Sequence, residues 1–214
     1  MSLSLEVSYF RFAVYDLFSS LFVYNFYDED YNALLKKLDD VSQVETDAVD
    51  LKAIRDAVKS VPKGELLIEY TTLFMTGTGF KPLVPVESKR LYSILGENAA
   101  WKNYNDVLRF YRRRGIEVNY MLGQFTPEPD HIASELAFMA YLIREEIKAR
   151  KEGKLDWQLV EDQKNFFISH IYSWVPDWAN DVVNDPRSNV YKVVCRELRK
   201  WLDLERKVVQ GGER

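Results

Sequence analysis

The 214-residue sequence predicts an all-α protein, a single globular domain of about ten helices that spans residues 1–214. Apolar residues recur three and four positions apart along almost the whole chain, which is the spacing of an amphipathic helix. The alternating pattern of a strand is found only in the short segment IEVNYML, at residues 116–122. The chain contains no internal repeat and no low-complexity tract, so one helical domain is the expected architecture.

Four helices are expected in the first third of the chain. The apolar face of the first helix is formed by four residues at helical spacing: Phe10, Val14, Leu17 and Leu21. Further aromatic residues occupy its other faces, so this helix should be buried on several sides. Shorter apolar faces predict a second helix around residues 31–38 and a third around 51–58. Pro62 opens the fourth, because a first helical turn leaves its amide hydrogens unbonded in any case.

An apolar loop follows the fourth helix. The stretch TGTGFKPLVPVES contains two glycines and two prolines, so no regular helix is expected before about Val86. Because the stretch also contains several apolar residues, we do not expect it to lie free in solvent. An apolar loop stiffened by proline should pack either against the body of the protein or against a ligand, and both interpretations stay open.

Five further helices are expected in the rest of the chain, at residues 87–95, 98–114, 126–153, 156–174 and 188–210. The clearest of them begins in TPEPDHIASEL. There Pro127 and Pro129 fit the first turn of a helix. The N-cap is expected at Thr126 or Asp130, because short polar side chains accept the free amides of a first turn.

The composition points away from several classes of protein. The formal net charge is −4, whereas a domain that binds duplex nucleic acid usually carries a basic stripe, so no nucleic-acid partner is expected. With Cys195 as its only cysteine, the chain can form no internal disulfide and no thiolate zinc site. The N-terminus does not have the pattern of a secretory signal. No stretch approaches about 18 uninterrupted apolar residues, so we expect a soluble cytoplasmic protein without stable membrane insertion.

Residue types that serve catalysis are scarce. The chain has two histidines, His131 and His170, whereas a carboxylate di-iron bundle needs a Glu-x-x-His pair on each of two helices. Glu128 and His131 form one such pair, but Phe167 stands at the matching position before His170. Neither a GxxxxGK[ST] loop nor a Gly-x-Ser-x-Gly motif is present. We therefore expect no catalytic residue, no metal ion and no cofactor. A metal- or nucleotide-dependent hydrolase that uses Asp130 and His131 is the alternative.

The surroundings of Asp130 and His131 allow two interpretations. A histidine beside carboxylates at the start of a helix can be a solvated surface cluster, which contributes little to stability. It can equally be a polar anchor at the mouth of a groove, since Ser134, Glu135 and Phe138 lie on the same side of the expected helix. Spacing alone favours the surface cluster.

Four segments resemble, in order and spacing, the motifs of the TorD-like family of redox-enzyme maturation chaperones, which includes assembly factors of nitrate reductase and dimethyl sulfoxide reductase. EPDHIASELAFM is similar to the Glu-Pro-x-Asp-His run that opens a long helix in that family, and it is the most specific of the four. The other three are YTTLFMTG, VPVESKRLY and FFISHIYSWVPDW. The resemblance covers roughly residues 10–205.

The resemblance implies an all-helical chaperone without catalytic activity, a monomer or dimer. Members of the family bind the N-terminal leader, often a twin-arginine signal, of the catalytic subunit of a molybdopterin oxidoreductase. They hold it in the cytoplasm until the molybdenum cofactor has been inserted. Guanine nucleotide binding has been proposed for some members, although this chain has no phosphate-binding loop motif. A helical scaffold or regulator without leader specificity is a further hypothesis.

Carried over residue by residue, the resemblance implies a peptide-binding site. Asp130 and His131 match the Asp-His pair, Glu128 and Pro129 match the two positions before it in the motif, and Glu87 matches the Glu-Ser segment. A twin-arginine leader has two cations followed by an apolar stretch, so these acids could pair with its arginines. The apolar stretch could be covered by residues of the proline-rich loop: Phe80, Leu83, Val84 and Pro85.

Overall fold

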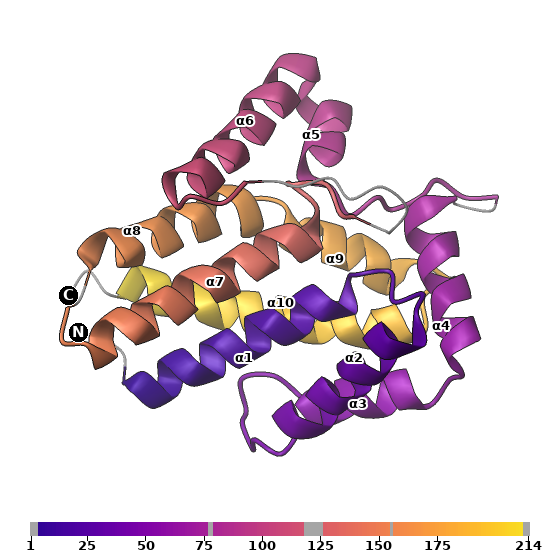
Figure 1. Ribbon diagram of the computed structural model, residues 1–214. Helices are drawn as coiled ribbons and strands as arrows, with labels where there is room; N and C mark the ends of the chain where they lie inside the picture. The colour runs from indigo at the N-terminus through magenta and orange to yellow at the C-terminus, as the bar shows by residue number, and fades with distance from the viewer. Residues whose placement is uncertain (1–3, 77–78, 118–125, 155, 212–214) are drawn as a thin grey trace. The chain divides into compact units, whose positions relative to one another are not determined.

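The computed structural model describes residues 4–76, 79–117, 126–154 and 156–211 (Figure 1). Within these ranges the chain forms ten α-helices and two short π-helical segments, and strand-like pairing is limited to one isolated bridge between Val86 and His131. The predicted all-α class is confirmed. The candidate strand IEVNYML lies outside the described residues from position 118 onward.

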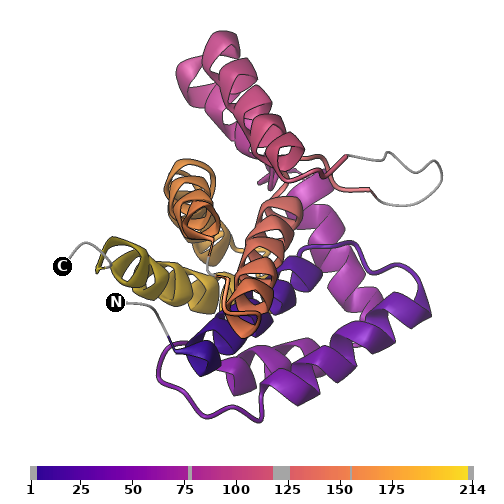
Figure 2. The same ribbon diagram turned by 60° about the vertical axis from the view of Figure 1, so that its left-hand side comes forward.

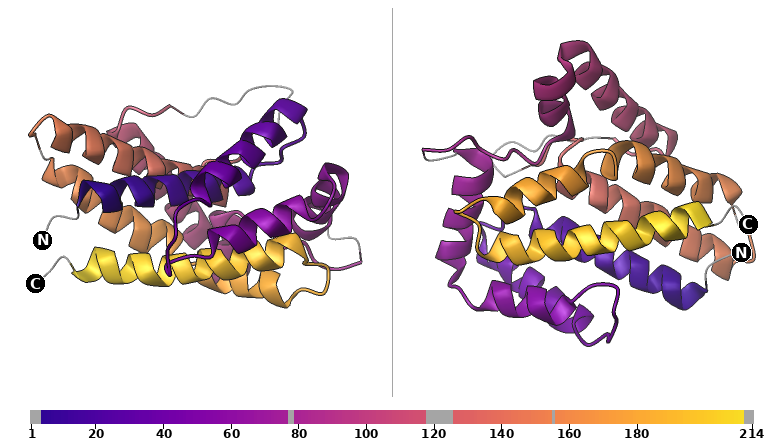
Figure 3. Two further views of the ribbon diagram at one scale, coloured as in Figure 1. Left: turned by 90° about the horizontal axis from the view of Figure 1, so that it is seen from below. Right: turned by 180° about the vertical axis from the view of Figure 1, so that it is seen from behind.

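The chain folds into two compact units. The first unit consists of residues 1–23, 86–174 and 207–214, and the second of residues 24–85 and 175–206. The chain therefore passes from one unit to the other four times. Its last helix, α10 (Val190–Gly211), is continuous through the final passage (Figure 3). The expectation of a single domain over residues 1–214 stays a prediction.

Five α-helices lie within the first unit, together with the π-helical segment η2. They are α1 (Leu5–Leu21), α5 (Glu87–Leu95), α6 (Glu97–Arg113), α7 (Ile132–Lys151) and α8 (Trp157–Phe166), and η2 spans Phe167–Ile171. Helices α1 and α7 pack along one another, and α8 packs against α7. Helices α5 and α6 form a helical hairpin, seen in magenta in Figures 1 and 2. They are joined at Gly96, whose φ of 85° suits a residue without a side chain.

The core of the first unit follows the predicted helical faces. The apolar stripe of α7 is buried as expected: Ile132, Leu136, Met139, Ile143 and Ile147. On α1 the side chains of Val14, Tyr15, Leu17 and Phe18 are buried, so this helix is covered on several sides, as predicted. Each fully buried side chain of this size contributes roughly 1.5–3 kcal/mol through the hydrophobic effect.

The second unit holds four further α-helices, the first part of α10 and the π-helical segment η1. These are α2 (Asp28–Val41), α3 (Leu51–Lys59), α4 (Lys63–Tyr70), η1 (Thr71–Met75) and α9 (Val175–Asn184). Its core includes an aromatic cluster in which the Phe74 ring lies 5.0 Å from Tyr70, 5.6 Å from Trp178 and 5.0 Å from Tyr191, between centroids. The side chain of Glu69 accepts backbone amides at the start of α10.

The predicted start of α7 is wrong. The N-cap of this helix is His131, whereas the sequence predicts Thr126 or Asp130 in that role. Pro127 and Pro129 precede the helix and do not occupy its first turn. The physical reason is that Asp130 directs its carboxylate to another helix, as described below.

The predicted helix at 156–174 also needs a correction. Its regular α-helical part ends at Phe166 and is followed by the π-helical segment η2. The sequence predicts no helix between residues 174 and 188, whereas α9 occupies Val175–Asn184. Pro176 stands at the second residue of α9, where its missing amide hydrogen removes no helical bond. No helix in the described part of the chain combines the length and the apolar character needed to cross a membrane.

Candidate functional site

The segment of residues 128–131, called the signature segment below, lies between the starts of two helices of the first unit. Asp130 is fully buried, and its Oδ2 accepts the backbone N–H of Ser88 at 2.9 Å. Its backbone carbonyl accepts the N–H of Glu87 at 2.9 Å. Glu87 and Ser88 are the first two residues of α5, so Asp130 supplies the acceptors that the free amides of this helix end require.

His131 serves the start of α7 in the same manner. Its Nδ1 accepts the N–H of Ala133 at 3.1 Å, which requires an unprotonated Nδ1. Burial, followed by the charge of Lys89, lowers the pKa of His131 to about 3, so the imidazole is neutral at physiological pH. Asp130 and His131 are 0% and 5% exposed, so the solvated surface cluster favoured by spacing alone is wrong.

A buried polar network surrounds Glu87. Its carboxylate is 1% exposed; Oε2 lies 3.0 Å from Nδ1 of His170, and Oε1 accepts the amide of Asn103 at 2.6 Å. The other ring nitrogen of His170 lies 3.2 Å from Oδ2 of Asp106. Each nitrogen of His170 therefore faces a carboxylate oxygen, and a protonated imidazole can donate to both.

Glu135 on α7 completes this network. The indole N–H of Trp174 points both to Oε2 of Glu135 at 3.1 Å and to the carbonyl oxygen of His170 at 2.6 Å. Burial raises the pKa of Glu135 well above its usual range, and the carboxylates of Glu87 and Asp130 raise it further. Burial also raises the pKa of Glu87 and of Asp130. The three neighbouring buried acids therefore disfavour one another's ionised forms, most strongly at Glu135.

Oδ1 of Asp130, on a residue that is 0% exposed, has no hydrogen-bond partner within the described part of the chain. A buried acceptor without a partner costs roughly 1–3 kcal/mol. Such groups are rare in folded proteins, and together with raised pKa values they are typical of functional regions.

The network joins three of the four sequence motifs. Glu87 comes from VPVESKRLY, Asp130 and Glu135 from EPDHIASELAFM, and His170 and Trp174 from FFISHIYSWVPDW. Sequence reasoning singled out Glu87 and the signature segment but gave no role to Asp106, Asn103, Glu135 or His170. A signal was available at His170 and Trp174, which are four residues apart and so lie on one side of a helix.

Two residues of the signature segment differ in exposure. The carboxylate of Glu128 reaches solvent, with its side chain 45% exposed, and it accepts Lys89 Nζ at 2.7 Å. Pro129 is buried, and its carbonyl oxygen accepts the hydroxyl of Tyr111 at 2.7 Å. Glu128 is therefore the acid of this segment that a partner can reach without a change of structure.

The proline-rich loop belongs to the second unit, and it is bound to that unit's own core. The N–H of Leu83 bonds to the carbonyl of Leu73 at 2.8 Å, and the indole of Trp178 donates to the carbonyl of Leu83 at 3.0 Å. Leu83 and Val84 are half-buried and Pro85 is buried. Phe80 is 55% exposed, and the guanidinium carbon of Arg187 lies 5.0 Å from the centre of its ring. The loop thus packs on its own unit and leaves one aromatic ring accessible.

The described residues contain no group of three or more His, Cys, Asp or Glu side chains arranged to hold a metal ion.

Comparisons with known proteins agree on one family. A sequence model of the nitrate reductase delta subunit family matches residues 28–180. The chlorate reductase assembly chaperone protein of Ideonella dechloratans is 27% identical over 114 residues, which make up 51% of this chain and 53% of that protein. The chain thus matches about half the length of this curated relative.

A solved structure shares the fold. The crystal structure described as that of a redox enzyme maturation protein from Archaeoglobus fulgidus superposes with a TM-score of 0.57. The match covers 90% of this chain and 93% of that one, at 21% sequence identity. At this identity the likeness establishes the shared all-helical fold.

Proposed function

The chain belongs to the nitrate reductase delta subunit family, and from this premise we propose that it is an assembly chaperone for a molybdenum-cofactor oxidoreductase. In this proposal it binds the N-terminal leader of the catalytic subunit, often a twin-arginine signal, and assists cofactor insertion before export. The family resemblance drawn from the sequence motifs is confirmed by the family match, and the solved structure shares the expected all-helical fold.

The observation that carries the proposal is that the signature segment caps two helices. Asp130 accepts an amide of α5 and His131 Nδ1 accepts an amide of α7, so neither is placed as a nucleophile or as a general base. The starts of α5 and α7 are therefore both bonded to the signature segment, beside the buried polar network. This arrangement supports a binding surface, and the proposal therefore includes no catalytic activity.

Within the first unit, Glu128 is the residue of the signature segment proposed to contact the leader. It is already engaged with the cation of Lys89, and an arginine can replace that cation with a planar, bidentate partner. The buried residues of the expected site are proposed to hold this segment in place: Glu87, Pro129, Asp130 and His131.

A separate part of the proposal concerns the second unit alone. The exposed ring of Phe80 is proposed to contact the apolar part of the leader. Leu83 and Val84 offer half-buried edges beside it in sequence, and Pro85 stiffens the loop. The same loop can therefore pack on its own core and bind a ligand.

Co-purification from the native cell tests the proposal. The tagged full-length protein should capture the catalytic subunit of a molybdopterin oxidoreductase, and deletion of that subunit's leader should abolish capture. Equal capture without the leader would remove leader specificity and favour a general scaffold. Glu128→Gln should weaken binding of the leader peptide, whereas Glu161→Gln, at an exposed position of α8, should leave it unchanged.

Three further properties form part of the proposal. The protein acts in the cytoplasm, because the leader must be bound before export. It binds no nucleic acid, in line with its net charge of −4. It works as a monomer or a dimer, and the sedimentation coefficient of the purified protein would distinguish the two.

A further inference from the structure

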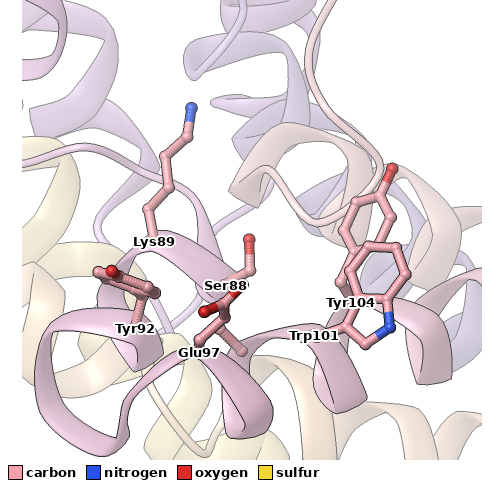
Figure 4. A pocket seen from close by; sticks show the side chains of 7 residues that line it. Ser88, Lys89, Tyr92, Glu97, Trp101 and Tyr104 are labelled. Atoms are coloured by element: carbon pink, nitrogen blue, oxygen red, sulfur yellow. The ribbon is translucent and has the colours of Figure 1, made fainter.

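A pocket of about 530 Å³ lies between α5 and α6, within the first unit. Six of the residues that line it bear on its chemistry: Ser88, Lys89, Tyr92, Glu97, Trp101 and Tyr104. Figure 4 shows Tyr92 on one side and the rings of Trp101 and Tyr104 on the other, with Ser88 and Glu97 between them. We call this the aromatic pocket.

The walls of the aromatic pocket are large rings that the fold leaves in solvent. Trp101 is 65% exposed and Tyr92 is 61% exposed. The rings of Trp101 and Tyr104 are stacked, with centroids 6.0 Å apart and an angle of 17° between the planes. Trp101 lies off the buried face of α6, which is formed by Ala100, Val107, Phe110 and Tyr111, whereas Tyr104 stands at the edge of that face and is half-buried. Exposed apolar surface of this kind usually marks a place where another molecule binds.

The charges around the pocket leave one carboxylate without a counter-ion. Lys89 is paired with Glu128 at 2.7 Å, so these two charges cancel. The side chain of Glu97 is exposed and has no hydrogen bond or ion pair with any described residue. It stands in the first turn of α6. The lining of the pocket carries one positive charge, on Lys89, and one negative charge, on Glu97. Because Glu128, outside the lining, already pairs with Lys89, the carboxylate of Glu97 remains to complement a cation.

We propose that the aromatic pocket binds an arginine side chain of a partner peptide. The guanidinium can lie flat against Trp101, because it stacks on aromatic faces and is attracted to their electron density. Its edge can then donate two parallel hydrogen bonds to Glu97. A lysine lacks the planar fork and should bind less tightly. Resting on the proposed function, we assign the peptide as the leader and the bound residue as one of its arginines.

The signature segment supports this pocket directly. Ser88 and Lys89 line the pocket, and both are bonded to the signature segment: Ser88 N–H to Asp130 and Lys89 Nζ to Glu128. Asp130 is therefore a positioning residue, which holds the start of α5 and with it one side of the pocket. Its burial does not prevent it from influencing binding.

Binding of short synthetic peptides to the full-length protein tests the inference. The probe has two adjacent arginines followed by an apolar stretch, and matched peptides carry lysine or glutamine in place of both arginines. Affinity is measured by calorimetry. Trp101→Ala should weaken binding of the arginine peptide about three- to thirtyfold, and Glu97→Gln about fivefold. The control is Trp157→Ala on α8, where a tryptophan is 70% exposed but lies outside the pocket. It should bind as the wild type does.

Each of the following alternative results would contradict one part of the inference. If the wild type binds the arginine peptide and the Trp101 and Glu97 variants bind it equally well, the pocket is not the site, although the proposed function stands. Equal binding of the glutamine peptide removes the arginine assignment. Binding of GTP that depends on Trp101, without peptide binding, makes this a nucleotide pocket. If the protein does not co-purify with an oxidoreductase but the pocket still selects arginine, the proposed function is wrong. The assignment of the pocket as an arginine site then remains.

Discussion

Both units of the molecule contain a carboxylate that accepts the free amides at the start of a helix distant in sequence, and the two differ in how completely they are satisfied. In the second unit, Glu69 Oε1 accepts the N–H of Asn189 at 2.8 Å and of Tyr191 at 2.9 Å, and Oε2 accepts that of Val190 at 3.0 Å. In the first unit, Oδ2 of Asp130 accepts the backbone N–H of Ser88, and its Oδ1 has no partner among the described residues.

Glu69 is therefore a purely structural cap, whereas Asp130 is a buried acid whose surroundings disfavour its charge. Glu69 uses both oxygens, and every bond it makes also satisfies a helix-terminal amide. Asp130 is fully buried with one oxygen unsatisfied, and burial raises its pKa. A fold selected for stability alone gains nothing from such an acid. We therefore propose that Asp130 serves binding, by holding the start of α5 beside the aromatic pocket.

Removal of the structural cap should have the largest effect on stability. Glu69→Ala leaves three amides at the start of α10 without their acceptor, so we expect a loss of about 3 kcal/mol in the free energy of unfolding. Glu65→Ala, one turn earlier on α4 and exposed, is the control and should stay within about 0.5 kcal/mol. Urea denaturation measures both. Equal midpoints for the two variants would show that the contacts of Glu69 contribute nothing net.

The double variant Asp130→Ala with His131→Ala should be less destabilising but should impair binding. It removes the caps of α5 and α7, each worth about 0.5–2 kcal/mol, so we expect a loss of about 2 kcal/mol. Both side chains are buried, so the cost should exceed that of a single cap.

Affinity for the arginine peptide should fall about tenfold in the same double variant, because α5 loses the acceptors that hold Ser88 and the pocket wall. Glu69→Ala should bind the peptide normally under conditions in which it stays folded. If Glu69→Ala and the double variant lose affinity in proportion to their loss of stability, the functional distinction between the two caps is wrong.

The positions of most helices could be predicted because their apolar spacing is a local property. The stripe of Ile132, Leu136 and Met139 identifies its helix wherever the rest of the chain lies. Pro176 illustrates the limit, since a proline ends one helix and begins another with equal ease. Local sequence does not distinguish these two cases.

The sequence could locate the site, but it could not predict the contacts that the residues of the site make. The sequence predicts Thr126 or Asp130 as the N-cap, but the carboxylate of Asp130 is taken by α5, so His131 caps α7 instead. Glu135 has the spacing of a surface acid, and only Trp174, distant in sequence, shows why it is buried. At the aromatic pocket the sequence contains one usable signal, because Trp101 stands off the apolar face of its helix.

The acid stability of the protein should depend on His131. Its pKa is about 3 in the folded state against 6.5 for a free histidine, so between these values the unfolded state binds the additional proton and stability falls as pH falls. His131→Asn keeps a capping acceptor without titrating. Relative to this variant, we expect the wild type to lose about 1–2 kcal/mol between pH 7 and pH 5. Denaturation midpoints across this range measure it, and parallel profiles would show that His131 is not buried as a neutral cap.

The smallest change tests the role of Asp130 most directly. In Asp130→Asn the amide oxygen can still accept the N–H of Ser88, and the NH2 group takes the place of the unpartnered Oδ1. Because the folded state already disfavours the ionised form of Asp130, removing its charge should cost no more than about 0.5 kcal/mol. If Asp130 only positions α5, this variant should bind the arginine peptide as the wild type does, in contrast to Asp130→Ala. If Asp130 instead paired with a leader arginine through its charge, the asparagine variant would lose about tenfold in affinity with an unchanged denaturation midpoint. We expect the first result, because the carboxylate is enclosed and the open acid of the aromatic pocket is Glu97.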